Sequence, residues 1–219
     1  MTIQSPLPSA EPPHDCTRCS RLVDFRVAVS TEEPEWWNAP VPAFGDPSAW
    51  LAIVGLAPGK HGANRTGRPF TGDYAGDLLY ATLARYRLSS GRYEARRDDD
   101  VELHGAIILN AVRCLPPQNK PTPEEIRTCR PYLEAALEAL PHVKVVIALG
   151  AIAHQSAVKA LGGRLPKAKF AHGAEHVMPD GRVLLDSYHC SRYNQNTRVL
   201  TPELFRSVFV RALELRSST

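Results

Sequence analysis

The sequence predicts an α/β fold: a three-layer α/β/α sandwich with a central four-stranded parallel sheet. Apolar runs of strand length alternate four times with segments of helical periodicity. Such alternation is typical of parallel strands joined by helices that cover both faces of one sheet. The length of 219 residues and a hydrophobic content of 43% suit one well-buried domain. We therefore expect a single domain over residues 16–219.

Residues 1–15 are expected to form a flexible lead-in, because they are rich in proline and serine and show no apolar periodicity. Cys16 and Cys19 follow in a Cys-x-x-Cys pattern, whose two sulfurs can reach one metal centre from a single turn. The arm at residues 32–42 contains two tryptophans, which we expect to pack against the domain.

A Gly- and Pro-rich loop follows the first predicted strand, at residues 51–55, and carries several polar side chains. A buried parallel strand delivers polar groups to a site in this way. Asp73 is the first carboxylate in this loop. It either caps the helix predicted at residues 74–88 or takes part in chemistry.

The remaining elements repeat this alternation. Thr122, Pro123 and Glu125 provide the N-cap, the first-turn proline and the glutamate of a capping box. The acidic run at residues 98–100 is interpreted as a solvated loop. We expect the ligand site at the carboxyl ends of the strands. Strands are predicted at residues 105–112, 143–150 and 182–189, and helices at residues 123–140, 151–161 and from residue 201 on.

The distribution of charge predicts a partner, although the net charge of +3 is too small to do so alone. Three strand-end stretches, residues 51–72, 105–123 and 187–202, contain no Asp or Glu. This edge of the sheet is therefore expected to be electropositive and to bind a polyanion. The alternative is a chance clustering of solvent-facing basic residues. The basic residues in these stretches are Lys60, Arg65, Arg68, Arg113, Lys120, Arg192 and Arg198.

No run of sequence approaches transmembrane length, and the N-terminus lacks a basic-then-apolar signal pattern. We therefore expect a cytoplasmic protein with no membrane association. The five cysteines of such a chain favour metal or redox chemistry over disulfides.

Four of the cysteines form a candidate metal site. Cys114 follows the second predicted strand and Cys129 lies in the capped helix, so that with Cys16 and Cys19 they could tie the N-terminal arm to the core. The alternatives are buried apolar thiols and a tetrahedral zinc site. Cys190 is left over, and a packed thiol is a better interpretation of it than a nucleophile.

Motifs at three strand ends resemble those of the uracil-DNA glycosylase superfamily. Gly55-Leu-Ala-Pro-Gly59, followed by Gly-Arg-Pro-Phe70, resembles the first motif of that superfamily. Asn110 resembles its uracil-reading asparagine, and the stretch that begins at His189 resembles its late histidine motif. The four cysteines stand where the iron-sulfur branches place their cluster ligands. The chain is most similar to the type 5 (type B) branch, since Leu56 stands where the type 4 branch carries glutamate. Departures from the type 5 pattern are Lys60, Cys190 and Arg198.

This resemblance implies a monofunctional DNA-repair glycosylase. Such an enzyme would flip uracil, and other deaminated bases such as hypoxanthine or xanthine, out of double-stranded DNA and hydrolyse the bond to the sugar, leaving an abasic site. The resemblance also implies a structural 4Fe-4S cluster, favoured over zinc, and a monomer. A catalytically inactive iron-sulfur or zinc nucleic-acid-binding module is the alternative, and a hydrolase of free nucleotides or nucleosides is a third possibility.

The resemblance implies roles for four residues in particular. Phe70 would stack on the extruded base, Asn110 would read its edge, His189 would donate a hydrogen bond to the departing base, and Asp73 would orient or activate water. Their alternatives are a core phenylalanine, a strand-end cap, a structural histidine and a helix N-cap. Arg192 and Tyr193 could fill the gap that the base leaves. The full set expected to bind substrate is Gly55, Leu56, Ala57, Pro58, Gly59, Phe70, Asn110, Ser191, Arg192 and Asn194.

Overall fold

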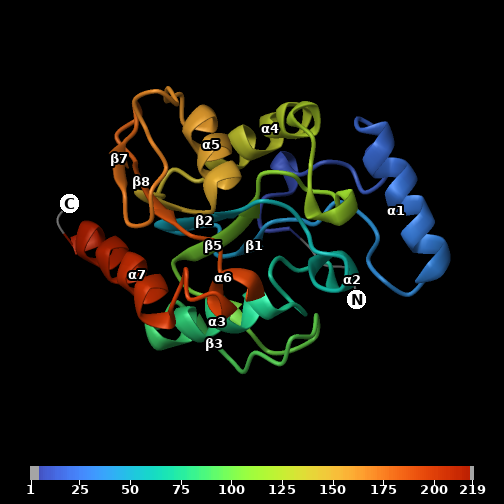
Figure 1. Cartoon of the computed structure of the whole chain (residues 1–219), viewed down its shortest axis with the longest axis horizontal. Coiled ribbons are helices and arrows are strands. Elements are labelled where there is room, and N and C mark those ends of the chain that lie inside the picture. Colours follow the sequence, from blue (N-terminus) through green and yellow to red (C-terminus); the bar gives the residue numbers. More distant parts are fainter. Residues whose placement is uncertain (1–4, 218–219) are drawn as a thin grey trace.

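The computed structural model describes residues 5–217 and contains a six-stranded mixed sheet (Figure 1). Its four central strands are parallel, which confirms the predicted α/β class. The two outer strands are antiparallel to their neighbours and were not predicted, because two or three residues are too few to show a period. In spatial order the strands are β1 (Phe44–Gly45), β5 (Ala106–Asn110), β2 (Leu51–Gly55), β6 (Val145–Leu149), β8 (Val183–Ser187) and β7 (Glu175–Val177).

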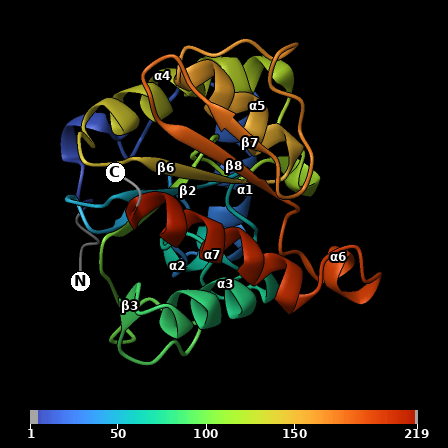
Figure 2. The same ribbon diagram turned by 90° about the vertical axis from the view of Figure 1, so that its left-hand side faces the viewer.

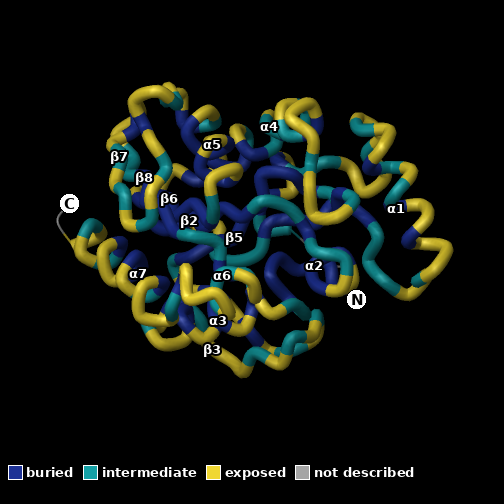
Figure 3. Tube along the Cα trace, in the orientation of Figure 1, coloured by how far each residue is buried: buried dark blue, intermediate teal, exposed yellow. Residues whose placement is uncertain are grey.

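Helices cover both faces of the sheet, as the turned view shows (Figure 2). Successive strand residues point to opposite faces of the sheet. Ile53 therefore packs against the helices on one face, and Val54 packs against the helices on the other. One face is covered by α3 (Tyr74–Arg85) and α7 (Pro202–Ser217), and the other by α4 (Pro123–Glu138) and α5 (Ala151–Ala160). The central strands are buried along nearly their whole length, whereas the loops are largely exposed (Figure 3).

The remaining elements lie around this sandwich. They are the 3-10 helices η1 (Pro8–Ala10) and η2 (Pro117–Asn119), the helices α1 (Ser20–Glu32), α2 (Ala63–Thr66) and α6 (Arg192–Asn196), and a small hairpin of β3 (Ser89–Ser90) and β4 (Glu102–Leu103). Within the described residues, no helix is both long and apolar enough to cross a membrane.

The start of the chain packs more closely than the prediction of a flexible lead-in over residues 1–15 implies. Residues 1–4 lie outside the described part of the chain, but Leu7 and Ala10 are buried in the core beside α4. Glu11 accepts a hydrogen bond from the backbone N–H of Ala43 at 2.8 Å, and its second oxygen lies 3.2 Å from the buried Arg113 guanidinium. Two buried apolar side chains and one buried ion pair therefore order this segment, although its sequence shows no periodicity.

Candidate active site and cysteine pocket

The carboxyl ends of the parallel strands open onto a cavity of about 360 Å³. Gly55 and Asn110 are register partners at the ends of β2 and β5, and His189 follows the end of β8. The cavity lies where the sequence predicted a ligand site. Its lining residues are Leu56, Ala57, Gly59, Ala63, Phe70, Asp73, Tyr74, Ala75, Asn110, Asn119, His189, Ser191 and Arg192.

Three of the expected binding residues do not line this cavity. Gly55 lies behind it, and a Cβ added there would meet the Asn110 Oδ1 atom at 2.6 Å and the Phe70 ring at 2.7 Å. Asn194 lies behind the histidine, where its side-chain amide donates to the His189 carbonyl at 2.8 Å. Both residues therefore position their neighbours. Pro58, in the loop after β2, does not line the cavity either.

Phe70 is held in an unusual backbone conformation, with φ at 53°. A bulky residue in the left-handed region is strained, by about 1–3 kcal/mol, and such strain persists only where the surroundings fix it. The ring is 7% exposed and stacks near the His189 ring, with 5.9 Å between centroids and 29° between planes. One edge of the cavity is therefore a flat apolar wall.

Asn110 lines the cavity and has a side-chain oxygen without a hydrogen-bond partner in the described part of the chain. The residue is 2% exposed, and its Oδ1 atom is buried without a hydrogen-bond partner among the described residues. A buried acceptor left unpaired costs about 1–3 kcal/mol. A ligand that donates a hydrogen bond here would recover that cost.

Asp73 serves as the N-cap of α3, since its Oδ1 atom accepts a hydrogen bond from the Gly76 N–H at 3.2 Å. Burial raises the pKa of this carboxyl, although the backbone N–H groups of the first turn oppose the shift. Its Oδ2 atom lies against the backbone of Gly62, where any side chain would collide with it. The cap predicted from the sequence is present, and Asp73 also lines the cavity.

His189 is uncharged near neutral pH, because burial lowers its pKa to about 4. A neutral imidazole carries one N–H donor and one acceptor. The site therefore contains a histidine that can donate a hydrogen bond without bringing a positive charge into the free cavity.

The helix after this histidine, α6, projects from the body of the molecule (Figure 2). Ser191 caps it by accepting from the Asn194 N–H at 3.3 Å. The Arg192 guanidinium lies 4.9 Å from the centre of the Tyr74 ring, and Tyr193 is 74% exposed. The arrangement puts a cation and an exposed aromatic ring beside the cavity mouth.

The predicted basic edge is smaller than the sequence count implied. Arg68 and Arg113 are buried and ion-paired, to Asp99 and Glu11 respectively. Lys60 pairs with Glu32 at 2.9 Å. Charge counting along the sequence could not detect these partners, because they are distant in the chain. The residues that remain exposed are Arg65, Lys120, Arg192 and Arg198.

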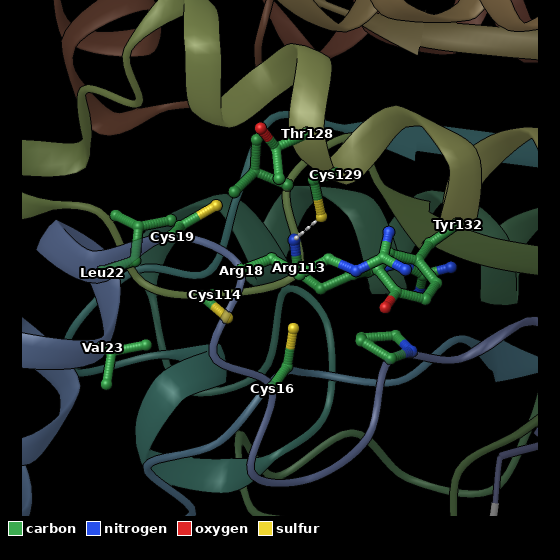
Figure 4. Close-up of a pocket in the computed structure, with 12 residues that line it drawn as sticks. Cys16, Arg18, Cys19, Leu22, Val23, Arg113, Cys114, Thr128, Cys129 and Tyr132 are labelled. Carbon is green, nitrogen blue, oxygen red and sulfur yellow. Dashed lines mark hydrogen bonds between the residues drawn. The ribbon is translucent and has the colours of Figure 1, made fainter.

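The four cysteines expected to bind metal converge on a second cavity, and their sulfurs point into it (Figure 4). Cys129 accepts a hydrogen bond from the Arg113 N–H at 3.3 Å, and Cys114 accepts from the Arg26 guanidinium at 3.7 Å. Burial raises the pKa of the Cys19 thiol to about 11 and that of Cys114 to about 12. Among the described residues, these thiols are not found as a group close enough together to hold a single metal ion.

Cys190 is fully buried in the core cluster of α3 and α7, as the interpretation of a packed thiol requires.

A buried polar cluster that the sequence did not indicate links α5, β7 and β8. His154 lies 2.7 Å from one oxygen of Asp186, and His176 lies 3.1 Å from the other. The second ring nitrogen of His154 contacts the carbonyl of Ala168 at 3.0 Å. In the described part of the chain, the ligand atoms of His154, His176 and Asp186 lie close enough together to hold a single metal ion. Its internal hydrogen bonds already occupy both carboxylate oxygens.

Comparison with known proteins gives consistent matches along most of the chain. A family model described as the uracil DNA glycosylase superfamily matches residues 42–213. A type-5 uracil-DNA glycosylase of Thermus thermophilus is 48% identical over 206 residues, which cover 91% of this chain and 93% of that protein. A type-5 uracil-DNA glycosylase of Pyrobaculum aerophilum is 43% identical over 202 residues, which cover 90% and 88%. A type-4 uracil-DNA glycosylase of Sulfurisphaera tokodaii is 28% identical over 199 residues, which cover 88% and 78%.

Proposed function

Because the chain belongs to the uracil DNA glycosylase superfamily, we propose that it is a monofunctional type 5 uracil-DNA glycosylase of base excision repair. It would remove uracil by hydrolysis and leave an abasic site. The observation that carries this proposal is the single cavity that brings together Phe70, Asp73, Asn110 and His189. A module that only bound nucleic acid would not need this combination.

The base would be held between an apolar face and a polar edge. The Phe70 ring offers the stacking surface, and Asn110 can present both an amide donor and its unpartnered acceptor to the edge of uracil. Pairing that acceptor recovers the cost of its burial. Binding of the correct base therefore gains from a group that the folded chain leaves unsatisfied.

Bond cleavage would place charge on both fragments. As the sugar–base bond breaks, its electron pair goes to the base, and a hydrogen bond from neutral His189 stabilises the uracil anion at its oxygen. One such preorganised donor is typically worth about 3 kcal/mol. Water adds to the sugar carbon, and its proton passes to the Asp73 carboxylate, whose raised pKa favours that transfer.

The substrate would be a base in double-stranded DNA. Exposed Arg65, Arg192 and Arg198 supply positive charge around the strand ends, and Tyr193 on the projecting α6 can enter the gap left by the base. A cavity of about 360 Å³ also supports removal of the larger bases hypoxanthine and xanthine. We infer in addition that the protein acts as a monomer in the cytoplasm.

The cysteine pocket would hold a structural 4Fe-4S cluster through Cys16, Cys19, Cys114 and Cys129. All four thiols line one pocket, and four cysteine thiolates are the ligand set that a 4Fe-4S cluster takes. The N–H groups of Arg113 and Arg26 would stabilise the thiolates. Iron content and visible absorbance of the purified protein test this assignment.

The test of the proposed function is cleavage of end-labelled duplexes containing one uracil opposite guanine, followed by alkali. The wild type is expected to give scission at the uracil. His189→Ala and Asp73→Asn should lower the single-turnover rate by about 100-fold or more while duplex binding persists. Asparagine is a good N-cap, so Asp73→Asn separates chemistry from capping. Tight binding without scission of uracil, hypoxanthine or xanthine would favour the inactive binding module, and cleavage of free nucleosides alone would favour the third possibility.

A further inference from the structure

Behind the Phe70 wall lies a buried group of residues that the proposed chemistry does not use. Arg68 makes two hydrogen bonds to the Asp99 carboxylate, at 2.6 and 2.7 Å, and the side chains are 4% and 1% exposed. Asp99 belongs to the acidic run that the sequence suggested was a solvated loop. That interpretation is wrong for this residue, because its partner approaches from a different loop.

This ion pair holds two segments together. The Arg68 Nε atom donates to the Thr71 hydroxyl at 2.7 Å, on the loop that carries Phe70. The Asp99 carboxylate accepts from the Glu94 N–H at 3.0 Å, directly after Tyr93. A bidentate pair between buried partners is rigid and directional. Each partner therefore fixes its own loop, and the pair fixes the loops relative to each other.

Tyr93 extends from the second loop onto the backbone of the first. Its hydroxyl donates to the Phe70 carbonyl at 3.1 Å and accepts from the Gly72 N–H at 3.3 Å. Its ring stacks on that of Tyr80, with 4.3 Å between centroids, and the Tyr80 hydroxyl donates to the Pro69 carbonyl at 2.9 Å. The two tyrosine hydroxyls thus bind the carbonyl groups of Pro69 and Phe70. They hold the two peptide groups that flank the α-carbon of Phe70.

The same hydroxyl lies against the start of α3. A Cβ added to Gly76 would meet both the Phe70 carbonyl and the Tyr93 hydroxyl, so only glycine permits this approach. The Gly76 N–H also donates to the carboxylate of Asp73, the N-cap of α3. The stacking wall and the carboxylate are therefore fixed by one continuous set of contacts.

We propose that Tyr93 and Asp99 are positioning residues for base excision. They keep Phe70 in its left-handed conformation and set the distance between its ring and the Asp73 carboxylate before DNA binds. Neither residue lines the cavity, so both would act through Phe70 and Asp73. This inference rests on the proposed glycosylase function.

The test uses Tyr93→Phe, which removes the hydroxyl and keeps the ring that stacks on Tyr80. Single-turnover rates are measured over a range of enzyme concentrations on the uracil duplex, below the melting temperature of every variant. The maximal rate should fall about tenfold, while the half-saturating concentration changes by less than about twofold, because geometry is lost and DNA contacts are kept. Tyr80→Phe should give a smaller fall in the same maximal rate.

The matched control is Tyr86→Phe, which removes a tyrosine hydroxyl at the far end of α3 and should keep the wild-type maximal rate. A merely structural role for Tyr93 would lower the melting temperature and leave the maximal rate unchanged. That result, or a change confined to the half-saturating concentration, would overturn the inference. If the wild type itself does not cleave, the proposed function fails instead, so the two failures are distinguishable.

Discussion

Burial sets the chemistry of single residues in the cavity. His189 and Asp73 both line this cavity, and burial favours the uncharged form of each, lowering the pKa of the histidine and raising that of the carboxyl. An uncharged histidine can donate to a departing anion, and a carboxylate with a raised pKa accepts a proton more readily. Both properties follow from removing the side chains from water.

The depressed pKa of His189 makes stability depend on pH. Between about 6.5 and about 4 the unfolded chain binds a proton at this residue and the folded chain does not. The free energy of unfolding should therefore fall as the pH falls through this window, by up to about 3 kcal/mol from this residue. Urea unfolding of wild type and His189→Gln at several pH values measures the contribution. Parallel stability profiles for the two proteins would contradict the prediction.

At the scale of elements, the sheet places residues from distant parts of the sequence at one edge. The register of β2 and β5 sets Gly55 beside Asn110, and the loop after β5 reaches Cys114 four residues later. Helix α4 then carries Cys129 into the same pocket. The orientation of α4 thus affects the cysteine pocket directly.

The capping box of α4 should make a measurable contribution. Thr122 accepts from the Glu125 N–H at 3.2 Å, and the Glu125 side chain accepts from the Thr122 N–H at 2.7 Å. Thr122→Ala should lower the free energy of unfolding by about 1 kcal/mol. Thr31→Ala, at the exposed last turn of α1, is the matched control and should change stability little. Equal stability of both variants with the wild type would show that the cap contributes nothing.

At the scale of the whole molecule, exposed basic residues occur both in the stretch predicted to bind a polyanion, where Arg198 follows α6, and outside it, where Lys159 lies in the last turn of α5. Each phosphate contact adds to the salt dependence of DNA binding. Arg198→Ala should therefore reduce the slope of log affinity against log salt by about 0.9. Lys159→Ala, in the last turn of α5, removes the same charge and should leave the slope unchanged. Binding is measured on a duplex with a stable abasic-site analogue, and equal slopes for both variants would exclude Arg198 from the interface.

The sequence predicted the elements whose signal is local. The four parallel strands are long apolar runs, and the Asp73 and Thr122 caps are short-range patterns. The partners of Arg68 and Arg113, by contrast, lie in other loops, so only the folded chain shows that these bases are buried. The cluster around Asp186 was missed for the same reason, since its histidines come from two other elements.

The unpartnered oxygen of Asn110 has a consequence for heat resistance. Replacement by leucine, of similar size, would remove a buried polar group that the fold does not satisfy, so the variant should be at least as stable as the wild type and inactive. Under selection for thermal tolerance alone, this position would lose its asparagine. Asparagine is kept at this position only where binding of a ligand is also selected. The stability that the protein gives up at Asn110 measures how far the free site is already arranged for that ligand.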